Sequence, residues 1–350
     1  MTPAAPAASS PIGVAVVGNG MATRVFHAPY IAACPALRLA AVVSRRPEVP
    51  VPAGAERRAE ISEVLHDPAI ELVVVATPSD THAALAAQAL RAGKHVVAEK
   101  PLALSLAEAR DLAALAQTCD RLLVAFHNRR WDSDFLAIAE AVRDGRIGRV
   151  VHFESHFDRF RPQVRDRWRE AAGPGGGVWF DLGPHLVDQA LALFGMPQGV
   201  SADIAALRDG AQADDWAHVV LRYRRHRAIL HAGMCVAGGA PRFVVHGTQG
   251  TLVKQCLDPQ EAQSVAGLRP GDESWGRDPD PLRRIDAAGA ETQTLAPRGA
   301  QQAFYASLAA AIRGQGAPPN TLHELLGVHA VIEAAQVSAR EGRVVDPSLL

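Results

Sequence analysis

A lysine at the end of an apolar run is the first residue of this chain with clear chemical potential. Lys100 lies in Glu99-Lys100-Pro101, directly after the run His95-Val96-Val97-Ala98, which predicts a buried parallel strand. Open α/β sheets bind their ligands at the carboxyl ends of the strands, which is where this lysine lies. Pro101 restricts the backbone of the residue before it, so the ammonium group is directed at one place. Lys100 is therefore a candidate catalytic residue.

A second candidate pair lies in Asp181-Leu182-Gly183-Pro184-His185. Pro184 fits the first position of a helix, which places His185 in the first turn, where the helix dipole disfavours a protonated imidazole. A neutral imidazole can accept a proton, and Asp181 just before the turn is close enough to orient the ring or stabilise its charged form. Two alternatives stay open. One is a metal site with Asp188 as third ligand, and the other is a capping aspartate beside a merely buried histidine.

The elements that must position Lys100 alternate along the first third of the chain. Apolar runs predict strands at 12–17, 37–43, 71–76, 95–98 and 122–126. Between them, amphipathic stretches predict helices at 22–33, 80–92 and 105–118, the last with a Ser105/Glu108 capping box. This order indicates a doubly wound parallel sheet covered on both faces. We assign 12–127 to a Rossmann dinucleotide-binding domain, 128–350 to a second domain and 1–11 to a disordered tail.

The first turn of the predicted sheet carries a degenerate glycine motif, Gly18-Asn19-Gly20-Met21-Ala22-Thr23. Gly18 allows a tight turn, and Gly20 lets the backbone approach a diphosphate. Met21 and Ala22 open the helix whose free N–H groups would meet the negative charge. Thr23 replaces the third glycine and predicts looser helix–strand packing. The alternative is a tight turn without a ligand.

The end of the second predicted strand favours NADP over NAD. An NAD-specific site usually has an acidic residue here to bind the ribose hydroxyls. This chain has Ser44-Arg45-Arg46 instead, and the nearest acid is Glu48. A hydroxyl and a guanidinium suit the additional phosphate of NADP. The alternative is a solvated basic turn.

The second half of the chain is rich in strands with alternating polar and apolar residues. They are predicted at 150–157, 200–207, 217–223, 228–235, 242–246 and 250–254, with a hairpin at 247–250. This pattern suits an antiparallel sheet with one face covered. Residues 258–299 read as a long loop over the site, and helices follow at 302–313 and 321–340, the latter with a Thr321/Glu324 capping box. The sheet histidines show no ligand spacing and read as ordinary sheet residues; they are His218, His226, His231 and His246.

Composition excludes several classes of protein. The chain has 36 Lys and Arg against 37 Asp and Glu, so it has no excess of positive charge with which to bind nucleic acid or an anionic membrane surface. No apolar run approaches the ~20 residues that span a bilayer, and the first residues do not resemble a secretory signal. The four cysteines, far apart and without a CxxC pair, fit a reducing cytosol rather than a disulfide framework or a zinc site. We expect a cytoplasmic protein.

Taken together, the GxG turn, Glu99-Lys100-Pro101 and Asp181-x-Gly183-x-His185 resemble the Gfo/Idh/MocA oxidoreductase family, over nearly the whole chain from Ile12. The segments 126–135 and 154–163 resemble more narrowly the bacterial branch that contains NADP-dependent scyllo-inositol dehydrogenase. The resemblance implies a Rossmann domain followed by a large, open, mostly antiparallel sheet domain that often mediates oligomerisation, here a homodimer or homotetramer. It also implies hydride transfer at a carbon of a sugar or cyclitol.

The resemblance assigns roles to the candidate residues. His185 accepts the hydroxyl proton, Lys100 hydrogen-bonds the same oxygen, and Asp181 holds His185 or contacts the substrate. The Lys100–Pro101 peptide is expected to be cis, and the helix at 321–340 to pack back on the Rossmann domain. Further cofactor contacts are expected from Thr77, Pro78, Ser79, His82, Glu99 and Asn128. Weaker substrate-side candidates are Arg159, Arg165 and Trp168, from arginine-rich segments in which any single arginine has a surface ion pair as its alternative.

Two rival functions remain open at this stage. A non-catalytic NADP-binding or redox-sensing protein would keep Gly18, Gly20 and Arg45 without needing the Lys–Asp–His group. A metal-assisted hydrolase would use Asp181 and His185 as ligands.

Overall fold

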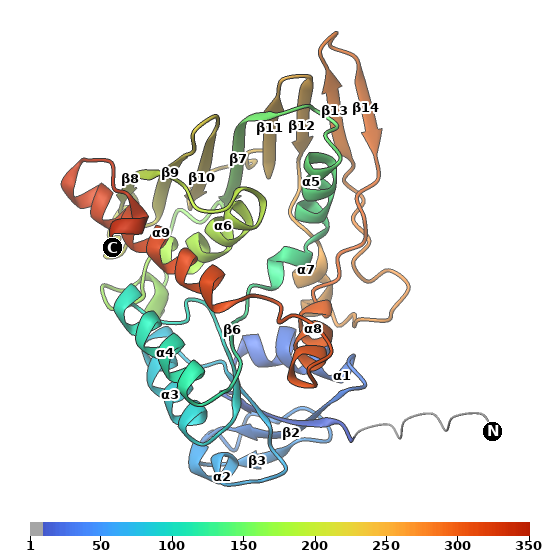
Figure 1. The fold of residues 1–350 in the computed structure, drawn as a ribbon, viewed down its shortest axis with the longest axis vertical. Coiled ribbons are helices and arrows are strands. Elements are labelled where there is room, and N and C mark those ends of the chain that lie inside the picture. Colours follow the sequence, from blue (N-terminus) through green and yellow to red (C-terminus); the bar gives the residue numbers. More distant parts are fainter. Residues whose placement is uncertain (1–9) are drawn as a thin grey trace.

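The computed structural model describes residues 10–350, so the predicted tail at 1–11 lies almost wholly outside the described residues. The chain forms two sheets, each with its own helices (Figure 1). Within the described range, no helix is both long enough and apolar enough to cross a membrane.

The first sheet has six parallel strands in the order β3-β2-β1-β4-β5-β6. Their bounds are β1 (Ile12–Val17), β2 (Leu37–Val43), β3 (Glu56–Arg58), β4 (Leu72–Val75), β5 (His95–Ala98) and β6 (Leu123–Ala125). This order, which reverses between β1 and β4, confirms the predicted doubly wound parallel sheet. The sequence did not predict β3, because Glu56-Arg57-Arg58 is a short polar strand at the sheet edge with no apolar run to mark it.

Helices cover both faces of this sheet. One face packs against α2 (Ile61–Leu65), α3 (His82–Arg91) and α4 (Leu106–Thr118). The other packs against α1 (Ala28–Ala32) and α8 (Ala303–Ile312), which returns from the end of the chain (Figure 1). Short helical turns also occur, namely η1 (Thr23–His27), a π-helical turn before α1, and η2 (Ser79–Thr81) before α3. The helix predicted at 22–33 is thus a π-turn that continues as α1.

The capping of α4 differs slightly from the prediction. Ser105 caps the helix by accepting a hydrogen bond from the Glu108 N–H. The Glu108 carboxylate binds the N–H of Leu104 rather than that of Ser105. The expected start of the helix is correct, but the return bond falls one residue earlier.

A connection leads from β6 through η3 (Asn128–Trp131) and α5 (Ser133–Arg143) to the second sheet, which has eight strands in the order β14-β13-β12-β11-β7-β10-β9-β8. Its strands include β7 (Val150–Asp158), β8 (Gly199–Ala205), β9 (Trp216–Arg222), β10 (Arg227–Gly233), β11 (Phe243–Gly247) and β12 (Gly250–Lys254). All pairs are antiparallel except β7 with β10. The mostly antiparallel sheet is confirmed, as is the two-residue hairpin between β11 and β12.

The prediction of a long loop at 258–299 is wrong. This segment contains α7 (Gln260–Val265), β13 (Leu282–Asp286) and β14 (Glu291–Thr294). The last two form a hairpin that extends the second sheet, and every residue of β14 is exposed. A strand without a buried face has no apolar alternation, so its sequence carried no strand signal.

Two helices next to each other in space join the two sheets. The first, α6 (Val178–Phe194), packs on β7, β9 and β10 of the second sheet. The second, α9 (Leu322–Glu341), packs on α6, β8 and α4, and its Leu325 belongs to the core of the first sheet (Figure 1). The predicted Thr321/Glu324 capping box starts α9, and the chain ends with η5 (Pro347–Leu349).

Candidate active site

Lys100 reaches across from the first sheet to the second. It lies just after β5, and its Nζ donates to the backbone carbonyl of Asp181 at 2.5 Å and to Asp181 Oδ1 at 3.1 Å. Both side chains are largely buried, with 12% of Lys100 and 19% of Asp181 exposed. The peptide between Lys100 and Pro101 is cis, as the resemblance implied. The carboxyl end of β5, through Lys100, is therefore in contact with the first turn of α6, through Asp181.

Asp181 is surrounded by positive charge. Besides Lys100, its carboxylate pairs with Arg169 Nε at 3.3 Å and lies 3.7 Å from Arg159 Nη1. Burial alone would raise the pKa of Asp181, but Lys100, Arg169 and Arg159 hold it well below its usual range. Asp181 is thus a fixed anion that positions cations and does not serve as an acid.

His185 lies in the middle of α6, which corrects the predicted start of this helix. The helix begins at Val178, so Pro184 is an internal residue and Asp181, not His185, lies in the first turn. The N–H groups of Val178 and Trp179 are capped by the backbone carbonyl and the carboxylate of Asp214. Because this cap comes from a distant residue, the local sequence carried no start signal, and Pro184 gave a misleading one.

The imidazole of His185 is buried, and its Nδ1 finds no hydrogen-bond partner in residues 10–350. Asp181 therefore does not hold the ring, contrary to one predicted role. Burial lowers the pKa of His185 well below 6.5, and the charges of Lys100 and Arg129 lower it further. The expectation of a neutral imidazole stands, but burial and nearby cations replace the helix dipole as its cause.

A buried ion pair and a buried hydrogen bond fix the helix that carries His185. The Asp188 carboxylate accepts from Arg130 Nε at 2.9 and 3.2 Å and from Arg130 Nη2 at 2.7 Å. Arg130 also binds Glu324 on α9. The neighbouring Gln189 accepts from Arg242 Nη2 at 2.6 Å. Asp188, the third ligand of the metal alternative, is thus committed to an arginine.

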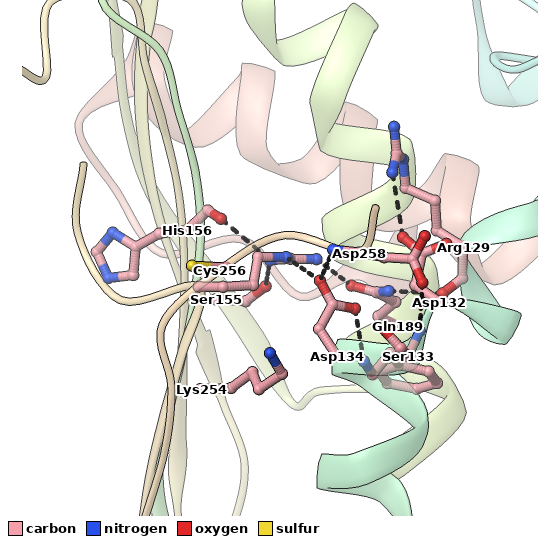
Figure 2. A network of polar contacts seen from close by, with 12 residues as sticks. Arg129, Asp132, Ser133, Asp134, Ser155, His156, Gln189, Lys254, Cys256 and Asp258 are labelled. Carbon is pink, nitrogen blue, oxygen red and sulfur yellow. Dashed lines mark hydrogen bonds and ion pairs between the residues drawn. The ribbon is translucent and has the colours of Figure 1, made fainter. Parts of the chain in front are cut away.

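Gln189 belongs to a polar network that ties α6 to α5 and β7, drawn in Figure 2. Arg242 binds Gln189, the Ser155 hydroxyl at 2.6 Å and Asp134 Oδ2 at 3.3 Å, and its guanidinium lies 4.8 Å from the centre of the Phe157 ring. The Phe157 ring in turn faces His185, with ring centres 6.3 Å apart. The buried Arg242 guanidinium thus contacts α6, β7 and α5 at once, which fixes the position of α6 relative to both.

Glu99 anchors the other side of the site. Its carboxylate binds His27 Nε2 at 3.1 Å, and His27 Nδ1 binds the Tyr305 hydroxyl at 2.7 Å. Burial would raise the pKa of Glu99, but its bond to His27 and the charges nearby, that of Lys100 among them, together outweigh burial and lower it. Glu99 therefore connects Lys100 to the helix after the glycine turn. His27 and Tyr305 were missed, because nothing in their local sequence points to this chain of contacts.

The glycine turn has the shape expected of a diphosphate-binding loop. Gly18 has φ of 106°, and a Cβ there would clash with the carbonyl of Ala76. A Cβ at Gly20 would meet no protein atom within 4 Å, and the side chain of Met21 beside it is exposed while Ala22 is half-buried. Thr23 is fully buried and donates to the Gly18 carbonyl at 2.8 Å, so it closes the turn where looser packing was predicted.

The predicted NADP-specific segment, Ser44-Arg45-Arg46, follows β2, the strand next to β1. Arg45 is exposed and forms a bidentate pair with Glu60, at 3.1 and 3.0 Å. The Ser44 hydroxyl accepts from the N–H of Arg46 at 3.3 Å. Arg57, on the unpredicted strand β3, donates to the Arg46 carbonyl at 2.7 Å and so adds a third guanidinium. Arg45, Arg46 and Arg57 together make this segment basic, and the Glu60 carboxylate already pairs with Arg45.

The predicted cofactor contacts His82, after β4, and Asn128, after β6, form hydrogen bonds to other loops of the protein. His82 is buried and lies between two carbonyls, with Nδ1 2.7 Å from Pro101 O and Nε2 2.8 Å from Thr77 O. It joins the loops after β4 and β5, in which Pro78 precedes η2 and Ser79 is buried. Asn128 is buried and donates to Gln301 at 2.9 Å. His82 therefore positions the loops with both ring nitrogens occupied, and Asn128 is held through its amide nitrogen.

On the substrate side, Arg159 lies at the site but Arg165 and Trp168 do not contact Asp181. Arg165 and Trp168 are exposed. Trp168 stacks on Arg169, whose guanidinium lies 4.3 Å from the ring centre and pairs with Asp181. Arg169 was missed because it was one of five arginines in a segment without regular structure. A small pocket beside Asp181 is lined by Arg167, Arg169, Glu170, Gly177, Val178, Arg208, Asp214 and Met234.

Another residue that sequence reasoning missed is His127, at the end of β6. It is buried, and burial together with Lys100 and Arg130 lowers its pKa, although Asp188 opposes this. A protonated His127 would lower the pKa of His185 further, so the two imidazoles disfavour each other's charged form. Its place directly after a predicted strand was a usable signal, since the carboxyl ends of parallel strands share one edge.

The fold is that of two-domain dinucleotide-binding oxidoreductases. Residues 12–127 match the profile described as "Oxidoreductase family, NAD-binding Rossmann fold", and residues 139–346 match "Oxidoreductase family, C-terminal alpha/beta domain". Both profiles are those of Gfo/Idh/MocA proteins, and the chain belongs to this family.

Relatives match over almost the full length. The chain is 46% identical to the uncharacterized oxidoreductase YdgJ of Escherichia coli, over 95% of this chain and 97% of that one. It is 37% identical to scyllo-inositol 2-dehydrogenase (NADP(+)) IolW of Bacillus subtilis, over 95% of both. Among solved structures, a putative oxidoreductase from Klebsiella pneumoniae superimposes with a TM-score of 0.90 at 48% identity, covering 97% of this chain and 95% of that one.

Proposed function

We propose that this chain is an NADP-dependent dehydrogenase that reversibly oxidises a secondary alcohol of a cyclitol or sugar. The observation that carries the proposal is the contact of Lys100, from the dinucleotide-binding sheet, with the helix that presents Asp181 and His185. The likeness to an NADP-dependent inositol dehydrogenase supports the choice of substrate class.

The residues present fit a dinucleotide. The turn at Gly18 admits no side chain, Gly20 leaves the backbone approachable, and the helix that follows begins with unpaired N–H groups. A nicotinamide dinucleotide bound here would supply the hydride acceptor for the alcohol carbon. Gly18, Gly20, Met21 and Ala22 would hold the diphosphate, with Ser44 and Arg45 at the ribose phosphate.

The side chains of this protein then handle the proton and the charge. His185, kept neutral by its surroundings, accepts the hydroxyl proton of the substrate. The Lys100 ammonium donates a hydrogen bond to the same oxygen and stabilises the negative charge that develops there. Asp181 holds Lys100 in position through two hydrogen bonds. Arg159 lies close enough to Asp181 to contact substrate hydroxyls.

A panel of inositols and aldoses, assayed with NADP and NAD at the nicotinamide absorbance, tests this proposal. We expect turnover with at least one cyclitol or sugar and a preference for NADP. Tight NADPH binding without turnover of any polyol would contradict the enzyme and favour the non-catalytic NADP-binding or redox-sensing alternative.

The choice of NADP has its own test at Arg45. A 2′-phosphate would replace Glu60 as the partner of this guanidinium. Arg45→Ala is expected to raise KM for NADP roughly tenfold while leaving KM for NAD nearly unchanged. Arg38→Ala, an exposed arginine at the opposite end of β2, is the matched control. Equal changes for both cofactors would contradict the NADP assignment.

We also propose a homodimer or homotetramer formed through the second sheet, in a reducing compartment such as the cytoplasm. The four cysteines, all within the described residues, are unpaired. Light scattering on the purified chain measures the assembly, and a monomer at micromolar concentration would contradict it.

A further inference from the structure

The face of the second sheet that points away from α6 carries a group of three side chains. His156 and Asp158 alternate along β7 with Phe153, Ser155 and Phe157, which point into the core. His231 lies on β10, and the parallel pairing of the two strands sets it directly beside His156. Figure 2 shows the His156 ring on the opposite side of the sheet from Asp134 and Gln189. The group is therefore separate from the candidate active site.

The spacing of the three side chains is that of metal ligands. His156 Nδ1 lies 3.5 Å from Asp158 Oδ2, and His231 Nε2 lies 3.6 Å from Asp158 Oδ1. One ligand atom from each residue lies within 4.8 Å of the others. Hydrogen bonds between such atoms are normally ~2.7–3.2 Å. Ligand atoms that are each 2.0–2.2 Å from a tetrahedral zinc ion lie about 3.4 Å apart.

Asp158 is buried without a conventional partner. Its side chain is only 4% exposed, yet neither carboxylate oxygen has a hydrogen-bond partner among the residues that the structure describes. His156 Nδ1 is unpartnered in the same way. Buried polar atoms of this kind are rare in folded proteins and call for a ligand, an ion or a water. Here they point at one another, at distances that an ion would bridge.

The outer contact of His156 is that expected of a metal-bound imidazole. His156 Nε2 is bound by Glu154 Oε2 at 3.1 Å, which leaves Nδ1 for a metal. Glu154 is itself held by His152 Nε2 at 2.7 Å. The second nitrogen of His231, Nδ1, lies 3.4 Å from His218 Nδ1. A carboxylate behind a ligating histidine fixes the ring and increases its basicity.

We propose that His156, Asp158 and His231 form a binding site for one divalent transition-metal ion of the zinc type. Two imidazoles and a carboxylate suit zinc, and the fourth position would be taken by water. The carboxylates of Asp158 and Glu154 together balance its two positive charges. The histidine side chains are 15% and 13% exposed in the single chain, so the ion can enter from solvent before chains assemble through this sheet. Once bound, it links β7 to β10 and is distinct from the catalytic group.

Zinc titration of the tag-free, chelator-treated full chain tests this site. Calorimetry is expected to give one zinc ion per chain with a Kd at or below the micromolar range, and cobalt(II) to give the visible absorption of a four-coordinate ion. His231→Gln and Asp158→Asn should each raise Kd at least tenfold. His246→Gln is the matched control, since His246 lies on β11 of the same sheet and binds Thr251.

The possible results separate the metal from a simpler explanation. If zinc binds equally well to the wild type, His231→Gln and His246→Gln, binding lies elsewhere and the proposal is wrong. If no zinc binds at millimolar concentration, the proposal is wrong and the group is two imidazoles packed around the Asp158 carboxylate without an ion. Should Asp158→Asn fail to fold, His231→Gln gives the same answer, because it keeps the buried carboxylate.

Discussion

Two histidines on opposite sides of β7, His185 of α6 and His156 of β7 itself, lie in opposite electrostatic surroundings. On the helix-covered face, His185 packs near Phe157, and the charges that act on it most, those of Lys100 and Arg129, are positive. On the other face, His156 lies between the carboxylates of Glu154 and Asp158. Cations keep an imidazole neutral and available as a base, whereas carboxylates orient it and favour a shared cation. The neighbours, and not the residue type, decide what each histidine can do.

The largest expected effect comes from removing the cation nearest the reaction. Lys100→Met should lower kcat by roughly a thousandfold, because the developing oxyanion loses its donor. NADPH affinity, measured by fluorescence titration, should stay nearly the same. Turnover like that of the wild type would remove Lys100 from the mechanism and leave the cation-rich face without a catalytic role.

The comparison of the faces is sharpened by replacing one histidine on each. His185→Gln is expected to reduce kcat/KM about a hundredfold or more, since the proton acceptor is lost. His246→Gln, on the face that carries His156, is expected to leave kcat/KM within about twofold, with the polyol panel as the assay. Comparable losses in both variants would show that the helix-covered face has no special role.

The buried network beneath Phe157 is predicted to be costly to break. Arg242→Leu leaves Asp134 and Gln189 without their cationic partner and should lower the free energy of unfolding by about 3 kcal/mol. Urea denaturation measures this loss. The exposed Arg222 of β9 provides the control, because its replacement by leucine should change the unfolding free energy by less than about 0.5 kcal/mol.

The smallest effect concerns pH. Because the pKa of His185 is lowered, its imidazole stays unprotonated below 6.5, where an ordinary histidine gains its proton. We expect kcat/KM for alcohol oxidation to fall on the acid side only below pH 6.5. An acid limb at or above that pH, measured with a substrate that is not itself ionised, would contradict the cationic surroundings assigned to His185.

Much of the site was predictable because its signals are local. Apolar runs predicted five of the six strands of the first sheet, and the ends of two of them carry Gly18 and Lys100. The failures share a cause, which is dependence on distant residues. The start of α6 depends on Asp214, and β14 is an exposed strand added to an edge. Likewise, His231 meets His156 only through the parallel pairing of β7 with β10, which no spacing along the chain records.

The return of α8 to the first sheet has a consequence for how the chain matures. Phe304, Tyr305 and Leu308 complete an apolar layer with Ile12 and Val14, and Tyr305 holds His27 behind Glu99. A nascent chain emerging from the ribosome cannot cover that layer until its last quarter has been synthesised. Recombination that joined the nucleotide-binding domain to a foreign partner after residue 127 would leave the layer in water. The two domains are therefore expected to be inherited together.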